Sequence, residues 1–317
     1  MKVVITGGAG LVGRAVVRAL RERGETVIAL VRDPRRAAHL AALGAELIGS
    51  DLSDVAALTE QLREADGLIH AAGTYRVGIP ASERPAMWEA NVGTTTRIFD
   101  AAGAAATPRI VYVSTVNVFG DTHGRIVDET YRREAATGFL SSYDETKYRA
   151  HELAERRIAD GAPIVIVMPS QVYGPGDESG FGEQLQRAHA GTLRYRAADV
   201  VIGLVHADDL AAGIVAALDR GRSGEAYVLS GPSTTFAHAI GIAARIGGHP
   251  PPRLRIPTSI LRALAPLGRF VGQPNLAEVI SASAGVTYLA TSAKAEAELG
   301  FTARDIETGL RDAFGAG

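Results

Sequence analysis

The chain has 317 residues, of which 46% are hydrophobic and 21% charged, an ordinary globular composition. It contains no cysteine, which excludes disulfides, thiolate zinc sites and a cysteine nucleophile. The net charge of −2 favours neither nucleic acid nor an anionic membrane as a partner. Apolar stretches such as 163–168 are far short of the roughly 20 residues that a membrane span needs. We see no signal or transit peptide and expect a cytoplasmic protein.

Apolar runs alternate with helical patterns through the first half of the chain. Strands are predicted at 3–6, 26–31, 45–49, 67–70, 109–114 and 164–167. Helices are predicted at 11–23, 35–43, 55–63, 84–104 and 142–160. This alternation implies βαβ units and a parallel sheet, and continuous apolar strands are typical of burial on both faces. The sequence therefore predicts an α/β fold with a doubly wound parallel sheet.

The alternation loosens after residue 169, where proline and glycine become frequent. A strand–helix step at 204–219 is expected to return to the first domain. We predict a larger domain at 1–169, to which 201–225 returns. The chain at 170–200 and 226–317 is predicted to form a smaller α/β domain that binds the substrate.

A glycine-rich loop, TGGAGLVG at 6–13, joins the first predicted strand to the first helix. Glycines at this spacing permit a tight turn, let the backbone approach a pyrophosphate and let the helix pack on the strand. The pyrophosphate then lies at the positive end of the helix. A purely structural turn is the alternative. The residues predicted to contact a dinucleotide here are Gly7, Gly10, Leu11, Val12 and Gly13.

The end of the second strand bears on the choice between NAD and NADP. Val31 stands where an NAD-binding protein usually carries an acid for the ribose 2′-hydroxyl. Arg32 follows it, and a guanidinium suits a 2′-phosphate. Asp33 comes one position late and is expected to form a turn before Pro34. We favour NADP, with NAD possible; the alternative is that Arg32 belongs to a solvated helix start.

Two further strand ends are predicted to contact the cofactor. Asp51 could accept from the adenine amino group while Leu52 packs on the ring, or Asp51 could cap the next helix. His70 is expected to be a packed histidine without a role in proton transfer. Three small residues after it would let the backbone approach the cofactor ribose: Ala71, Ala72 and Gly73.

A tyrosine and a lysine provide the most specific signal. Tyr143 and Lys147 are separated by four residues and share a helix face. An ammonium near a phenol stabilises the phenolate and lowers the tyrosine pKa, which suits proton transfer. The chain has only three lysines, so this pair rarely arises by chance. The alternative is an unrelated surface pair. Thr115 or Ser114, at the end of the fifth strand, could donate to a substrate oxygen.

These motifs resemble, in order and spacing, the extended short-chain dehydrogenase/reductases, that is, the NAD(P)-dependent epimerase/dehydratase family. The branch they resemble most is the dihydroflavonol-4-reductase-like one. The segments that carry the likeness are TGGAGLVG at 6–13, HAAG at 70–73, YVSTVNVFG at 112–120, YDETK at 143–147, PSQVYGPGD at 169–177 and VHADDLA at 205–211.

The resemblance implies a Rossmann-type NAD(P)-binding domain at 1–169. It implies that Tyr143 is the catalytic acid/base, that Lys147 is its partner and that Thr115 is the catalytic hydroxyl. Asn91 would be structural or a relay residue, and the helices at 84–104 and 142–160 would pair in a homodimer. Four residues would contact the cofactor near its nicotinamide: Ser114, Pro169, Ser170 and Val172.

Departures from the family pattern argue against some of the activities that the family carries out. Val116 and Asn117 replace the acid pair of nucleotide-sugar dehydratases. Ile202 replaces an arginine that commonly holds a diphosphate, which favours a smaller or less charged substrate. Met168 replaces a frequent arginine, and we attach no function to that change.

We therefore expect an NADP-dependent carbonyl reductase or alcohol dehydrogenase that moves hydride between nicotinamide C4 and a small-molecule substrate. One alternative is a sugar epimerase that retains its cofactor; another is a non-catalytic NAD(P)-binding sensor. No metal is expected, because His206, Asp208 and Asp209 read as a strand end followed by capping acids.

Overall fold

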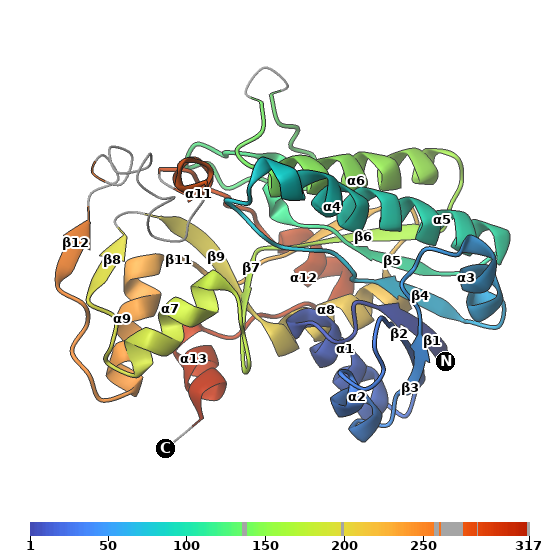
Figure 1. Ribbon diagram of the computed structural model, residues 1–317, viewed down its shortest axis with the longest axis horizontal. Coiled ribbons are helices and arrows are strands. Elements are labelled where there is room, and N and C mark those ends of the chain that lie inside the picture. The colour runs from blue at the N-terminus through green and yellow to red at the C-terminus, as the bar shows by residue number, and fades with distance from the viewer. Residues whose placement is uncertain (135–137, 198–199, 257–259, 261–274, 284, 316–317) are drawn as a thin grey trace.

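A seven-stranded parallel sheet forms the centre of the computed structural model, which describes residues 1–134, 138–197, 200–256, 260, 275–283 and 285–315 (Figure 1). The strand order is β10-β6-β5-β4-β1-β2-β3. The strands are β1 (Lys2–Thr6), β2 (Thr26–Val31), β3 (Glu46–Gly49), β4 (Gly67–His70), β5 (Ile110–Val113), β6 (Ile164–Pro169) and β10 (Ala226–Leu229).

Helices cover both faces of this sheet. One face carries α1 (Leu11–Glu22), α2 (Ala38–Ala42), α8 (Ala207–Arg220) and α12 (Ala293–Leu299). The other carries α3 (Val55–Leu62), α4 (Arg84–Trp88), α5 (Thr94–Ala104) and α6 (Ser142–Ala159). The prediction of an α/β doubly wound parallel sheet is confirmed.

Successive side chains along each central strand pack into two separate apolar cores, one on each face of the sheet. In β1, Val3 and Ile5 point into the core beneath α1 and α8, whereas Val4 points into the core beneath α3 and α5. All three side chains are fully buried. Successive side chains of a strand point to opposite faces, so a strand covered on both sides must be apolar throughout. This is why the predicted strands read as unbroken apolar runs.

A smaller unit lies beside the central sheet (Figure 1) and has a third apolar core of its own. A three-stranded sheet has the order β11-β9-β7, and a two-stranded sheet pairs β12 with β8. Its strands are β7 (Gln171–Tyr173), β8 (Tyr195–Ala197), β9 (Val201–His206), β11 (Ser233–Thr235) and β12 (Leu254–Ile256). Its helices are α7 (Gly180–His189), α9 (Phe236–Ile246), α11 (Leu276–Ser283) and α13 (Ile306–Phe314).

Two expected boundaries between the units need correction. The strand of the step at 204–219 is β9, which pairs with β7 and β11 in the smaller sheet, and only α8 packs on the central sheet. Conversely, β10 lies in the segment expected to belong to the smaller domain, yet its backbone pairs with β6 at the sheet edge. Strand pairing between distant segments decides both placements, and it leaves no periodic signal in either segment alone.

Two predicted helices also differ in detail. The helix expected at 84–104 is interrupted by a π-helical turn at Glu89–Gly93. The helix expected at 35–43 is reduced to the five residues of α2, because Asp33 and Pro34 begin a series of turns. Within the described part of the chain, no helix is both long and apolar enough to cross a membrane.

Candidate active site

The carboxyl ends of the central strands bring the predicted site residues to one edge of the sheet. Strands that run parallel all end on the same side, which is where ligands bind in open α/β sheets. The residues that follow these strands there include Gly7, Arg32, Asp51, Ala71, Ser114 and Ser170.

The glycine loop packs too closely for side chains at two of its positions. A Cβ on Gly7, whose φ is +74°, would lie 2.6 Å from the backbone of Ala71 and Ala72. A Cβ on Gly13 would lie 2.1 Å from the Gly7 carbonyl oxygen. The loop is therefore pressed against the residues that follow β4, and no side chain fits at Gly7.

The N-terminal end of α1 is built to receive an anion. Gly10 is the N-cap and has no side chain to cap the helix, and the first turn contains no acidic residue. A Cβ on Gly10 would meet only the Gly7 carbonyl oxygen, at 3.5 Å, so its outer side is open. Leu11 and Val12 form the first turn beside it. Uncapped N–H groups and the helix dipole favour a phosphate here, so the cradle fits a dinucleotide.

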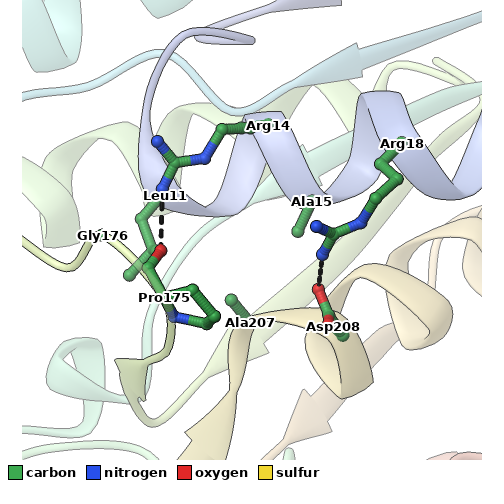
Figure 2. Close-up of a pocket in the computed structure, with 8 residues that line it drawn as sticks. All are labelled: Leu11, Arg14, Ala15, Arg18, Pro175, Gly176, Ala207 and Asp208. Carbon is green, nitrogen blue, oxygen red and sulfur yellow. Dashed lines mark hydrogen bonds and ion pairs between the residues drawn. The ribbon is translucent and has the colours of Figure 1, made fainter. Parts of the chain in front are cut away.

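A loop after β7 closes on this helix (Figure 2). The Arg14 guanidinium donates to the Pro175 carbonyl oxygen at 2.9 Å, and Arg18 forms an ion pair with Asp208. Between these contacts lies a cavity of about 300 Å³. A Cβ on Gly176, whose φ is +73°, would lie 2.9 Å from Arg14. The contacts hold the segment that follows Val172 against the predicted dinucleotide helix.

Arg32 is an exposed guanidinium at the end of β2, and in the described part of the chain it forms no hydrogen bond or ion pair. Val31 is buried, its side chain offers no acceptor, and its backbone carbonyl already accepts from the Ser50 N–H. The Asp33 carboxylate accepts from the Arg35 backbone N–H at 3.0 Å and lies 4.0 Å from Arg36. Asp33 thus forms the expected turn, and Arg32 is left as the available charged group.

The groups predicted to face the adenine have other contacts. Asp51 accepts from the backbone N–H and the hydroxyl of Ser53, at 2.9 and 2.6 Å. Asp54, and not Asp51, caps α3. Leu52 has a φ of +62° and a side chain only 8% exposed, while its carbonyl accepts from Arg97. The expected stacking of Leu52 on adenine is therefore restricted by its burial.

Tyr143 and Thr115 lie close together, because Thr115 comes just after β5 and Tyr143 lies at the start of α6. Tyr143 lies in the first turn of α6, which Ser141 caps, and it is 8% exposed. Thr115 lies next to the phenol, and its hydroxyl donates to the Asn117 side chain at 3.0 Å. Burial raises the pKa of Tyr143 well above its ordinary value, and the neighbouring Thr115 hydroxyl opposes that rise.

Lys147 lies one helical turn beyond Tyr143 and is buried. Its ammonium donates to the Val113 carbonyl oxygen at 3.0 Å and to the Tyr112 hydroxyl at 3.5 Å. Burial lowers the pKa of Lys147 to about 8. Burial is the largest influence on the pKa of Tyr143 in this structure, and Lys147 is not among the groups that shift it.

The two serines predicted near the nicotinamide differ in their partners. The Ser114 hydroxyl lies 2.9 Å from His151 Nδ1, so its side chain is directed away from the cleft. The Ser170 hydroxyl is buried and has no hydrogen-bond partner among the described residues. Buried polar atoms normally have partners, so Ser170 fits a polar group of a cofactor. Pro169 ends β6, and Val172 is half-buried in β7.

Two contacts support α6. One comes from Asn91, which the resemblance marks as a structural or relay residue, and the other from Glu278, which sequence reasoning missed. Asn91 lies in the π-helical turn, where its amide donates to Thr74 and Thr146 at 3.1 and 2.9 Å. Glu278, from α11, accepts from the Ser142 backbone N–H at 2.5 Å. The π-turn has no recognisable pattern, and Glu278 is 136 residues from its partner. Part of the expected substrate pocket, including 261–274, lies outside the described residues.

His70 is a packed histidine, as expected. Its Nδ1 lies 2.7 Å from the Thr6 hydroxyl and its Nε2 lies 3.0 Å from the Thr95 hydroxyl. Complete burial, with Lys147 nearby, lowers the pKa of His70 to about 3. The ring is therefore neutral at physiological pH and acts as a fixed hydrogen-bonding group.

A possible metal-ligating cluster brings His206, Asp208 and Asp312 within 4.8 Å. His206 Nδ1 accepts from the backbone N–H of Asp208 at 3.2 Å, which places the proton of the neutral ring on Nε2. Arg18 pairs with Asp208, and Arg304 pairs with Asp312 at 3.0 Å. Both carboxylates are thus paired with arginines. His206 itself caps α8, and Asp208 and Asp209 lie in the first turn of that helix, so the cap is the histidine and not the acids that the sequence indicated.

Comparison with known proteins places the chain in a family. The model of the NAD dependent epimerase/dehydratase family matches residues 3–230. The chain belongs to this family. A Synechocystis protein whose name assigns it to the dihydroflavonol 4-reductases is 32% identical, over 98% of this chain and 92% of its own length. A farnesyl-dihydroquinoline-oxide ketoreductase of Stigmatella aurantiaca is 31% identical, over 85% of this chain and 83% of its own.

Solved structures agree with this assignment. The crystal structure of gox2253 has a TM-score of 0.86 and 31% identity, and the match covers 99% of this chain and 97% of that one. Family and reductase relatives together identify an NAD(P)-dependent oxidoreductase of the extended short-chain type. Its cofactor is a nicotinamide dinucleotide.

His70 predicts a specific dependence of stability on pH. The unfolded chain binds this proton near pH 6.5 and the folded chain only near pH 3. Between these values the unfolded state holds more protons, so the free energy of unfolding should fall as the pH is lowered. The expected loss is up to about 1.4 kcal/mol per pH unit.

Urea denaturation of the wild type and His70→Gln at pH 7 and pH 4.5 measures the contribution of His70 to the free energy of unfolding. Glutamine cannot titrate, so the stability difference between the two proteins should change by about 2–3 kcal/mol in favour of the variant at low pH. A difference that stays constant with pH would contradict the buried neutral histidine.

Proposed function

We propose that this oxidoreductase is an NADP-dependent carbonyl reductase or alcohol dehydrogenase. The observation that carries the proposal is that the Thr115 hydroxyl lies beside the buried Tyr143 phenol, with Lys147 one helical turn away. A substrate carbonyl oxygen between the two hydroxyls would be polarised by Thr115 and receive its proton from Tyr143. The bound nicotinamide supplies the hydride.

The protonated Tyr143 phenol and the positive charge of Lys147 suit a site that reduces carbonyls. Burial keeps the Tyr143 proton in place until negative charge develops on the substrate oxygen. Lys147 holds a position against the end of β5 through the Val113 carbonyl. From there its positive charge would stabilise the phenolate that remains after proton transfer. Exclusion of water strengthens each of these interactions.

The surroundings of Tyr143 favour an apolar substrate. Tyr143 packs with Ile79, Met87 and Val77, and the ring of Tyr75 lies edge-on to it at 4.7 Å. Ile202, which replaces the family's diphosphate-binding arginine, is buried in the core of the smaller unit. We propose that this unit binds the substrate and the central sheet binds the cofactor. The names of two reductase relatives carry farnesyl and alkyl groups, which supports the same class.

A sugar epimerase that retains its cofactor is the second candidate. It is favoured by the structural likeness to a nucleoside-diphosphate-sugar epimerase of Pseudomonas aeruginosa, with 27% identity and a TM-score of 0.83. An epimerase would copurify with dinucleotide, visible by absorbance and native mass, whereas a reductase exchanges it. The intact set of Thr115, Tyr143 and Lys147 argues against a non-catalytic sensor.

We propose a homodimer in the cytoplasm, as the sequence predicts. Helices α5 and α6 lie side by side on one face of the sheet, where a two-fold axis would complete a four-helix bundle (Figure 1). Sedimentation at micromolar concentration should then give a particle of twice the 33.2 kDa chain mass. A particle of single-chain mass would refute the dimer and leave the chemistry unaffected.

Substitution of the proton donor tests the chemistry. Tyr143→Phe should lower kcat by at least about 100-fold on any apolar carbonyl that the wild type reduces, because only the acid is lost. Cofactor affinity, measured by fluorescence titration, should stay within about twofold. Lys147→Met should instead raise the cofactor Kd as well as lower kcat. Near wild-type turnover by Tyr143→Phe would remove this residue from the mechanism.

Substitution of Arg32 tests the cofactor choice. Two charge-assisted bonds from one guanidinium to a 2′-phosphate are worth about 1.5–3 kcal/mol, or roughly ten- to a hundredfold in affinity. We expect the wild type to bind NADPH more tightly than NADH and Arg32→Ala to lose that preference while keeping NADH. Arg36→Ala is the matched control, because Arg36 already lies near Asp33. Tighter NADH binding by the wild type would overturn the assignment.

A further inference from the structure

Two stretches of the smaller unit carry basic charge and no acidic residue. Residues 184–198 contain three arginines and residues 226–277 contain five, and neither stretch contains an aspartate, a glutamate or a lysine. The rest of the chain is left with 25 basic and 35 acidic residues, a net charge of −10. The overall charge of −2 therefore conceals a strong separation of charge along the sequence.

The fold brings these two stretches together. Strand β8 of the first stretch pairs in parallel with β12 of the second. The loops beside these strands also meet. A Cβ on Gly191 would lie 2.7 Å from the His249 ring, and a Cβ on Gly247 would lie 1.8 Å from the His189 carbonyl oxygen. Figure 1 shows β8 and β12 at the end of the long axis opposite to β3, so the arginines of both stretches belong to one end of the molecule.

Four arginine side chains at this end are exposed and unpaired. They are Arg187 on α7, Arg194 before β8, Arg245 on α9 and Arg253 before β12. Within the described part of the chain, their guanidinium groups have no hydrogen bond or ion pair. The acids of the neighbouring helix α13 already pair with other arginines or cap that helix. The positive charge of this end therefore remains available to an anionic partner.

Apolar side chains protrude among these arginines. Tyr195 is 45% exposed, Leu254 is 60% exposed and Ile260 is 50% exposed. They are three of the seven large hydrophobic side chains that are exposed among the described residues. Tyr195 and Leu254 are register partners in β8 and β12, so they point to the same face of this small sheet. Single exposed apolar residues are ordinary, but a group of them within a basic surface indicates a binding site.

An anionic membrane surface matches both properties of this end. Anionic lipid headgroups attract basic side chains, and apolar side chains at such an interface enter the boundary between headgroups and acyl chains. The long arginine side chains can keep their charge at the headgroups while their stems lie along apolar groups. A nucleic acid would attract the arginines, but it would leave the exposed leucine and isoleucine without an apolar environment.

We propose that the surface formed by Arg187, Arg194, Tyr195, Arg253 and Leu254 docks this protein onto an anionic membrane. The contact is peripheral and reversible, because the apolar group is small and the attraction is largely electrostatic. The docking goes beyond the proposed reductase chemistry and does not depend on it. It would place the smaller unit beside a lipid phase in which apolar carbonyl compounds dissolve.

Vesicle binding tests the role of the charge. The full chain should cosediment with vesicles of equal parts phosphatidylcholine and phosphatidylglycerol but not with phosphatidylcholine alone, and added salt should weaken the binding. One basic residue near such a surface strengthens binding by roughly fivefold, so Arg194→Gln combined with Arg253→Gln should weaken it by about 20- to 30-fold. Arg63→Gln combined with Arg84→Gln is the matched control, because it removes the same charge from exposed positions of the larger unit.

The absence of cysteine permits a direct test of the apolar contact. Leu254→Cys introduces a single thiol for an environment-sensitive fluorophore, and Ile126→Cys is the control at another exposed apolar position, between β5 and α6. The emission at position 254 should shift to shorter wavelength when the anionic vesicles are added, and the emission at position 126 should not. Leu254→Ser should weaken vesicle binding by at least about threefold. Its urea midpoint should match that of the wild type.

Equal vesicle binding by the double arginine variant and the wild type would overturn the docking surface. A fluorophore at position 254 that does not respond to bound vesicles would overturn it as well. Binding to single-stranded DNA or to polyglutamate, without binding to vesicles, would assign the surface to a soluble anionic partner and refute the membrane. None of these measurements needs turnover, so an absence of reductase activity would overturn only the proposed function.

Discussion

The parallel pairing of the central strands is the constraint on which the site depends. Because all seven strands run in one direction, their carboxyl ends meet at one edge, and the loops that follow them must share that edge. The glycine loop fits there only because Gly7 and Gly13 lack side chains, so that it can press against the end of β4. Thr115, Tyr143 and Lys147 reach the same edge from β5 and α6.

Burial sets the electrostatics of this edge. It raises the pKa of Tyr143 and lowers the pKa of Lys147 to about 8, so each group is biased toward its neutral form. Neither shift alone makes a catalyst, but each makes the group responsive to a charge brought close by a ligand. His70, with a pKa near 3, stays neutral throughout and adds no competing charge. Near neutral pH, Tyr143 and Lys147 can therefore change protonation in response to a ligand, whereas His70 cannot.

The same helix supplies both the reacting groups and their supports. Ser141 caps α6, the Arg133–Asp144 ion pair is almost fully buried beside its first turn, and Glu278 from the smaller unit accepts from its backbone. These contacts fix the direction of the helix relative to β5, which in turn fixes the distance from Lys147 to Val113. The smaller unit thus contributes to the geometry of α6.

The sequence by itself determined the doubly wound sheet, the glycine cradle, the free arginine after β2 and the pairing of Tyr143 with Lys147. These features depend on local periodicity, on steric limits at single glycines and on spacing along one helix, all of which are written in short segments. Only the tertiary structure decided that β9 leaves the central sheet while β10 joins it, that Ser114 faces His151 and not the cleft, and that Glu278 supports α6. Those outcomes depend on strand pairing and side-chain packing between residues far apart in the chain, where burial and available partners, not local pattern, select the contact.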